Sequence, residues 1–202
     1  MESVAKPGDE TRHEAARRRF DEANARDPNT LIVDGVAQPR ELIYSNWLTD
    51  WVLKLCPDAS EPLRLAARCQ HLCRWEIPRA SYPLTRLGYL QWRAELKKFH
   101  AQKSGEILRA VGCEEALICR VQELNLKRNF PDDPESRVLE DALCLVFLEH
   151  QLAELAAKAD AAKVINAIRK SWKKMTPMAH ATALGLALGP HEKLLIARAL
   201  AG

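Results

Sequence analysis

The stretch from Glu135 to Lys158 is the most apolar in the sequence, and it limits the fold more than any other segment. Its apolar side chains occupy positions that together cover most of the circumference of a helix: Val138, Leu139, Leu143, Leu145, Val146, Phe147 and Leu148. A helix that is apolar on nearly every side has to be buried by other elements. We therefore expect residues 135–158 to form one helix at the centre of the fold.

An acidic residue interrupts this apolar helix. Helical spacing places Asp141 on the same stripe as Val138, Leu145 and Leu152. An ionised carboxylate on a buried stripe needs a cation, a metal ion or several hydrogen-bond donors. A salt bridge to an arginine and ligation of a metal ion are the two interpretations that the sequence favours, and both stay open.

Helical periodicity extends over most of the remaining chain, which has only 8 Gly among 202 residues and few runs of β-branched residues. The sequence predicts further helices over residues 11–26, 40–55, 62–75, 88–111, 114–128, 161–175 and 178–201, with a turn-rich stretch through Gly35 and Pro39. A chain of this length favours one domain. We predict an all-α, single-domain helical bundle over residues 9–202, preceded by a flexible tail over residues 1–8.

Composition disfavours several functional classes. The sequence has no N-terminal apolar leader and no run of 18 or more apolar residues, so we expect a soluble, cytoplasmic protein without a membrane partner. The formal net charge of +3 is too small to argue for nucleic-acid binding by itself. The six cysteines lack paired zinc-site spacing, and we expect reduced core thiols. Cys69 and Cys73 flank His71 and could hold a metal ion, although packing is the better interpretation.

The densest group of arginine and aromatic side chains lies in residues 63–93. Between Arg64 and Lys103 the sequence has nine Lys or Arg but only Glu76 and Glu95 as acids. Because the planar guanidinium of arginine suits phosphate or carboxylate, we expect an anion-binding cavity with aromatic walls. The candidate ligand-binding residues are Arg68, Arg74, Trp75, Arg79, Tyr82, Arg86, Tyr89, Trp92 and Arg93. A solvated basic face with stacked aromatic rings is the alternative.

Two histidines accompany these arginines. In a helix over residues 62–75, His71 falls on a stripe that is separate from the apolar arc of Leu65 and Leu72. That stripe consists of Arg64, Arg68, His71 and Trp75. A functional role for His71 and a hydrogen bond to a neighbouring loop are both compatible with this position. His100 shares a helix face with Arg93 and apolar residues, as an ordinary half-buried histidine also would.

Five segments carry a resemblance to a known family: FDEANARDPN, LRLAARCQHLCRWEIPR, GYLQWRAELKKFH, LEDALCLVFLE and KSWKKM. Over nearly the whole chain the sequence resembles an uncharacterised bacterial and eukaryotic family, domain-of-unknown-function family 4202. The IPR and LED words are fairly specific to it. The resemblance implies membership of that family and brings no activity with it.

A more distant resemblance links LAARCQHL, FHAQKSGEILRAVG and VLEDALCLV to the metal-dependent phosphohydrolases named for their His-Asp doublet. Those proteins are all-α, so the resemblance implies an HD-like helical fold. It also implies that His71, His100 and Asp141 are metal ligands. The sequence departs from the pattern, because Leu72 stands where the doublet aspartate belongs and no histidine occurs around Tyr44. The resemblance therefore implies at most one divalent metal ion, Zn, Mn or Fe.

Under the first functional hypothesis the protein is a metal-dependent phosphohydrolase, or a degenerate relative of one. Its substrate would be a nucleotide or another small phosphorylated ligand. The resemblance implies catalytic roles for Asp141 and His71. The phosphate would be held by the arginines of the basic segment, because a fixed guanidinium stabilises charge that develops on a phosphoryl group.

Under the second hypothesis the same cavity binds RNA or a phosphorylated metabolite without catalysis, with bases on the aromatic rings and phosphates on the arginines. The two histidines and the aspartate would then form a buried network of hydrogen bonds and charges. A third interpretation is a helical interaction module whose Trp47, Trp51 and Trp172 cover a partner. A monomer and a homodimer are both compatible with these hypotheses.

Overall fold

The computed structural model describes residues 10–201, so the tail predicted for residues 1–8 lies outside the described residues. The chain is mostly helical, with ten α-helices and one two-stranded hairpin within the described range. It forms two compact units. Unit 1 runs up to Thr49 and resumes at Ala59–Arg128, and unit 2 consists of Asp50–Asp58 and the chain from Asn129 onward. That residues 9–202 form one domain stays a prediction.

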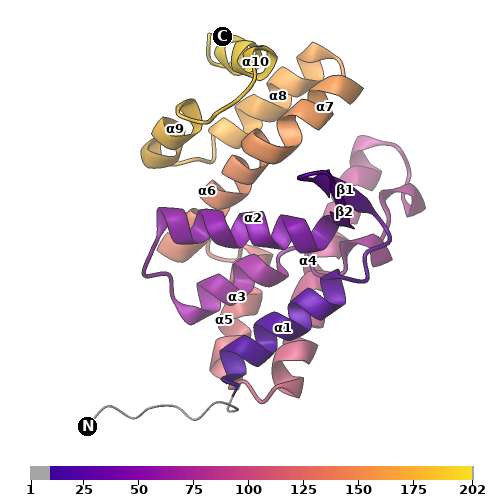
Figure 1. Ribbon diagram of the computed structural model, residues 1–202, viewed down its shortest axis with the longest axis vertical. Coiled ribbons are helices and arrows are strands. Elements are labelled where there is room, and N and C mark those ends of the chain that lie inside the picture. The colour runs from indigo at the N-terminus through magenta and orange to yellow at the C-terminus, as the bar shows by residue number, and fades with distance from the viewer. Residues whose placement is uncertain (1–9, 202) are drawn as a thin grey trace. The chain divides into compact units, whose positions relative to one another are not determined.

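The hairpin contradicts the all-α prediction for a short part of unit 1. Strand β1 (Thr30–Val33) pairs antiparallel with β2 (Val36–Pro39), and Figure 1 shows both strands at the start of α2. Asp34 and Gly35 connect them with φ angles of 51° and 78°. Positive φ at both central residues matches the twist of a hairpin, and Asp-Gly is a preferred pair for this turn. The stretch expected to be merely turn-rich therefore forms a hairpin.

Unit 1 contains four complete helices and most of a fifth: α1 (Arg12–Asn24), α2 (Arg40–Leu55, in this unit up to Thr49), α3 (Glu61–Cys69), α4 (Arg86–Ala110) and α5 (Glu115–Leu126). Helix α5 packs on α3 and α4, and α1 packs on the same two helices. The core between them consists of fully buried side chains, among them Phe20, Leu63, Leu65, Leu72, Leu108, Ile118 and Leu124. The predicted helices over residues 11–26, 40–55 and 114–128 are confirmed to within two residues at each end.

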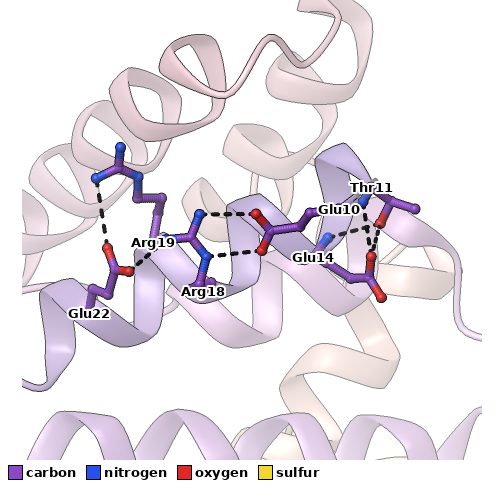
Figure 2. Close-up of polar contacts among 6 residues, drawn as sticks. All are labelled: Glu10, Thr11, Glu14, Arg18, Arg19 and Glu22. Carbon is purple, nitrogen blue, oxygen red and sulfur yellow. Dashed lines mark hydrogen bonds and ion pairs between the residues drawn. The ribbon is translucent and has the colours of Figure 1, made fainter. Parts of the chain in front are cut away.

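Helix α1 begins with a capping box and carries a row of ion pairs (Figure 2). The Thr11 hydroxyl accepts a hydrogen bond from the Glu14 backbone at 3.2 Å, and the Glu14 carboxylate accepts one from the Thr11 backbone at 2.9 Å. Further along, the Arg18 guanidinium donates to both Glu10 and Glu22. Exposed ion pairs of this kind contribute little to stability, so the capping box is the stronger determinant of where α1 starts.

Helix α3 ends earlier than the sequence predicts. Its last helical residue is Cys69, whereas the predicted helix ran to Trp75. Cys73 has a φ angle of 52°, and its backbone N–H donates to Asn24 Oδ1 at 3.0 Å. The chain then forms short 3-10 turns at Arg74–Glu76 and Arg79–Ser81. The predicted stripe through His71 and Trp75 is therefore wrong, because those residues are not on one helix.

Helix α4 is joined to the preceding loop by a very close contact. The Thr85 hydroxyl accepts a hydrogen bond from the Gly88 backbone at 3.1 Å and caps the helix. A Cβ atom on Gly88 would lie 2.3 Å from the carbonyl oxygen of Pro83, so only glycine fits there. The helix ends before Gly112, whose φ angle of 78° favours glycine.

Unit 2 is built around the apolar segment, which is not one regular helix. It forms α6 (Pro134–Val146), a π-helical turn (Phe147–Gln151) and α7 (Leu152–Lys158). Its central side chains are buried as predicted: Leu139, Leu145, Val146, Leu148 and Leu152. A π-helical turn contains one residue too many for the α-helical spacing, which shifts the buried face of α7 relative to that of α6.

The C-terminal part of unit 2 contains α8 (Ala161–Trp172), α9 (Pro177–Leu184) and α10 (Pro190–Leu200). Helix α8 packs on α7 and α10, and α9 packs on α6. The predicted single helix over residues 178–201 is wrong, because the chain leaves the helix at Gly185 and re-enters it only after Gly189. Proline at the start of both α9 and α10 is compatible with a first helical turn, where no backbone N–H is needed.

The six cysteines are all free thiols, but they do not all lie in the core. Cys69, Cys73 and Cys144 are buried, Cys119 is exposed, and Cys56 and Cys113 are half-buried. Among the helices of residues 10–201, none is both long enough and apolar enough to span a bilayer.

Candidate functional site

The candidate site is a cluster of polar and aromatic side chains in unit 1. It brings together residues from three distant parts of the sequence. Glu41 and Tyr44 come from the first two turns of α2, and His71 follows the end of α3. Arg74 belongs to the first 3-10 turn, and His100 lies in α4. We call these five residues the His71 cluster.

His71 is the centre of this cluster. Its ring stacks on Tyr44 with a centroid distance of 4.0 Å and an interplanar angle of 13°. His71 Nδ1 lies 3.2 Å from Glu41 Oε2, and His71 Nε2 lies 3.3 Å from Arg74 Nη1. A guanidinium can only donate, so Nε2 is the acceptor and Nδ1 carries the proton. With only 15% of its side chain exposed, His71 belongs to the interior and not to a solvated basic stripe.

His100 is the second histidine of the cluster, and it is more deeply buried. Its ring lies 5.9 Å from that of His71, and the residue is 3% exposed. His100 Nδ1 lies 2.9 Å from the carbonyl oxygen of Leu72. Because a carbonyl only accepts, Nδ1 carries the proton and Nε2 carries a lone pair. The prediction that His100 could be an ordinary half-buried histidine underestimates its burial.

Burial sets the charge states in the cluster. It lowers the pKa of His71 well below the usual value, and the positive charges of Arg74 and Arg93 act in the same direction. Burial and the neighbouring His71 lower the pKa of His100 to about 3. Burial also raises the pKa of Glu41 to about 7, although Arg74 opposes that shift. Both imidazoles are therefore neutral at pH 7, and Glu41 is about half protonated.

Arg74 connects the histidines to the aromatic part of the site. Its Nε lies 3.8 Å from Glu41 Oε1, and its guanidinium lies over the Trp92 ring at 4.8 Å from the centroid. The Trp92 indole N–H donates to the carbonyl oxygen of Ile77 at 2.9 Å, which fixes the ring. The Arg74 side chain is 22% exposed and so reaches solvent from a largely buried position.

Arg79 is held in place by the loop before α4. Its guanidinium donates to the carbonyl oxygens of Tyr82 and Pro83 at 2.9 Å and 2.8 Å. The same group lies 6.0 Å from the Tyr89 ring and 5.9 Å from the Trp92 ring. The structure thus brings together the side chains of four of the nine predicted ligand-binding residues, Arg74, Arg79, Tyr89 and Trp92, and the backbone carbonyl of a fifth, Tyr82.

The other predicted ligand-binding residues have different surroundings. Arg68 is buried and donates to Asp21 of α1, so it stabilises the packing of α1 on α3 and does not join the cluster. Arg93 is half-buried, and its charge lowers the pKa of His71 and of Arg74. Arg86 is exposed, and Trp75 is half-buried. Of these four residues, Arg93 is the one whose positive charge acts on the His71 cluster.

Asp141 lies in unit 2, and it is 2% exposed, as its position on the apolar stripe predicts. Its carboxylate accepts hydrogen bonds from the backbone N–H and the hydroxyl of Thr176, the first of them at 2.8 Å. Hydrogen-bond donors therefore satisfy this carboxylate, in place of the arginine or metal ion that the sequence favoured. The adjacent Glu140 forms an ion pair with Lys174 at 3.0 Å.

Comparison with known proteins places the chain in a family. The sequence model of the family described as Domain of unknown function (DUF4202) matches residues 14–196. The chain belongs to this family. The match begins in α1 and ends in α10, and it includes both units. A comparison with curated proteins and one with solved structures found no match. The more distant likeness to His-Asp phosphohydrolases stays a prediction.

Within each unit of this DUF4202 chain, the donors of the described residues do not form a metal site. Within residues 10–201, no three His, Cys, Asp or Glu side chains are grouped so that they could hold a metal ion. Both oxygens of Asp141 accept hydrogen bonds from Thr176. His71 Nε2 is occupied by the cationic Arg74. His71 and His100 lie in unit 1 and Asp141 lies in unit 2, and joint ligation of a metal ion by the three stays a prediction.

Two members of the site in this DUF4202 chain were missed from the sequence. Glu41 is an acid in the first turn of a predicted helix, where acids are common because they complement the helix dipole. Tyr44 lies among apolar residues of the same helix. No spacing rule connects either residue to His71. The sequence showed only that Glu41 and Tyr44 lie about one helical turn apart.

Proposed function

We propose that unit 1 binds a small phosphorylated ligand beside the His71 cluster. The observation that carries this proposal is the charge around Arg74. Arg74 and Arg93 contribute two positive charges, and within residues 10–201 no carboxylate forms an ion pair with Arg93. Glu41 faces them but is about half protonated near pH 7. A partly buried site with an excess of positive charge favours an anion.

The way in which the guanidinium groups of Arg74 and Arg79 are held supports phosphate as that anion. Arg74 is supported from one side by Trp92, and Arg79 is held by two backbone carbonyls. Guanidinium groups that are already fixed lose little side-chain entropy when they bind phosphate, and their donors are arranged as a fork. The Tyr89 ring is 47% exposed and offers a face on which a base could stack. A nucleotide is therefore a suitable member of the ligand class.

Calorimetric titration tests the proposal with inorganic phosphate, adenosine 5′-monophosphate and a short 5′-phosphorylated RNA as probes. We expect Arg74→Gln to weaken binding of the best probe about 10- to 100-fold, because a charge-assisted hydrogen bond contributes about 1.5–3 kcal/mol. Arg18→Gln on α1 is the matched control, because Arg18 is an exposed arginine that pairs with Glu10 and Glu22 of its own segment. The proposal fails if no phosphate probe binds, or if both variants lose affinity equally.

Hydrolysis of that ligand is a second candidate function, and the pair of Glu41 and His71 favours it. His71 becomes a suitable general base once Arg74 turns from His71 Nε2 to the bound phosphate, because that nitrogen then offers its lone pair. The Glu41 carboxylate on the other side of the ring, 3.2 Å from His71 Nδ1, stabilises the charged form of the imidazole. In this reading His71 is the catalytic residue and Glu41 positions it. Asp141 was expected to be catalytic from the resemblance, but here it has no assigned step.

Phosphate release distinguishes the two candidates. Hydrolysis predicts turnover of a bound phosphate ester by the wild type and loss of that turnover in His71→Gln, with binding retained. Simple binding predicts that the ester is recovered unchanged. The assay should be run with and without zinc, manganese and ferrous iron, since the His-Asp resemblance implies one of them. No step proposed here depends on a metal ion, because the described donors do not fit one.

A further inference from the structure

Two buried acceptor atoms in the His71 cluster have no hydrogen-bond partner among the described residues. They are Glu41 Oε2 and His100 Nε2. Glu41 is 6% exposed and His100 is 3% exposed, so bulk water does not replace the missing donors. Buried polar atoms of folded proteins are nearly always paired, and an exception calls for an explanation.

His100 Nε2 needs a donor, and so does Glu41 Oε2 when the carboxylate is ionised. His100 Nδ1 gives its proton to the Leu72 carbonyl oxygen, so His100 Nε2 presents a lone pair. His71 Nδ1 lies 3.2 Å from Glu41 Oε2, but this contact does not have hydrogen-bond geometry. Arg74 approaches the other oxygen of Glu41, at 3.8 Å. The cluster thus has two unused acceptors, and the charge of Arg74 acts on the pKa of both groups that carry them.

The positive charges near these two acceptors determine which kind of donor group a ligand can offer them. A ligand ammonium group would be repelled by Arg74 and Arg93, whose positive charges already lower the pKa of neighbouring groups. A hydroxyl group donates without adding charge. The cluster reaches solvent at His71 and Arg74, whose side chains are 15% and 22% exposed.

We propose that Glu41 and His100 form a hydroxyl-binding subsite, so that the ligand of unit 1 is a phosphorylated polyol, such as a sugar phosphate or the ribose phosphate of a nucleotide. This inference rests on the proposed function, because it specifies the rest of a ligand whose phosphate lies at Arg74. A site that hydrogen-bonds a substrate hydroxyl discriminates strongly against the analogue that lacks it, since its buried acceptors then stay unpaired.

A matched pair of ligands tests the subsite. Glycerol 3-phosphate and propyl phosphate have the same three-carbon chain and the same phosphate, but only the first has free hydroxyls. We expect wild-type protein to bind glycerol 3-phosphate at least about tenfold more tightly by calorimetry. In Glu41→Gln the preference should fall to less than about threefold, while propyl phosphate binds no more weakly than to wild type.

The control variant is Glu115→Gln, which removes an exposed carboxylate on α5 that pairs with Arg109. It should keep the full preference for glycerol 3-phosphate. Equal affinity of the wild type for the two ligands overturns the hydroxyl subsite and leaves phosphate binding intact. Absence of binding by both ligands and by inorganic phosphate overturns the proposed function and, with it, this inference. The comparison of the two ligands with wild-type protein does not depend on whether a variant folds.

Discussion

Asp141 in α6 accepts hydrogen bonds from both the backbone N–H and the hydroxyl of Thr176, the residue that caps α9. The two residues are 35 positions apart in the sequence. Thr176 in turn accepts a hydrogen bond from the Ala179 backbone at 3.3 Å. One buried carboxylate therefore fixes the start of α9 against α6, within unit 2.

Replacing this carboxylate should destabilise the protein. Asp141→Ala leaves two donors of Thr176 unpaired and removes charge-assisted hydrogen bonds, which should lower the free energy of unfolding by about 2–4 kcal/mol. Urea denaturation measures the change. Asp160→Ala is the control, because it removes an exposed helix cap of α8 and should cost only about 1 kcal/mol. Equal losses in the two variants would contradict a special role for the buried pair.

Glu41 should make the protein less stable as the pH rises. Its pKa is about 7 in the folded state, above the ordinary value of 4.5, so its stabilising contribution is complete below pH 4.5 and is lost as the pH rises through 7. Between pH 5 and pH 8 the loss should be on the order of 2–3 kcal/mol. Denaturation at both pH values should show this loss in wild type and not in Glu41→Gln, whereas the exposed Glu114→Gln should behave like wild type.

His100 should have the opposite pH dependence. Its pKa falls from 6.5 to about 3 in the folded state, so it contributes stability above pH 6.5 that is lost as the pH falls toward 3. His100→Gln should unfold less steeply with acidification between pH 6.5 and pH 4 than wild type does. Replacement of the exposed His191 by glutamine should leave the slope unchanged. A wild-type slope in His100→Gln would show that its imidazole titrates normally.

Gly88 should tolerate no side chain. Gly88→Ala brings a Cβ atom to 2.3 Å from the Pro83 carbonyl oxygen, so the loop that carries Arg79 has to move. We expect a loss of about 1–3 kcal/mol in the free energy of unfolding and weaker binding of phosphate. In Gly185→Ala the nearest atom is 3.5 Å away, so this control should change neither property. Thermal unfolding and phosphate titration of both variants check the contrast.

The basic and aromatic composition of the candidate site could be predicted from the sequence. Which individual residues belong to the site could not. The sequence pointed to Arg74, Arg79 and Trp92, which the structure brings together. The sequence could not show that Arg68 differs from these residues. Arg68 is buried and pairs with Asp21 because of the way α1 packs on α3. The hydrogen bond from the Cys73 backbone to Asn24, 49 positions earlier, likewise holds the turn after α3, and no local signal indicated it.

The sequence by itself determined the features that depend on neighbouring residues. Helical spacing predicted most of the helices and the burial of Asp141, because a helix repeats every few residues and its faces can be counted. Only the tertiary structure decided the partners. Thr176 for Asp141 and Glu41 for His71 lie on elements distant in the sequence. The physical reason is that periodicity states which side of a helix is buried, whereas packing decides which donor, acceptor or charge it meets there.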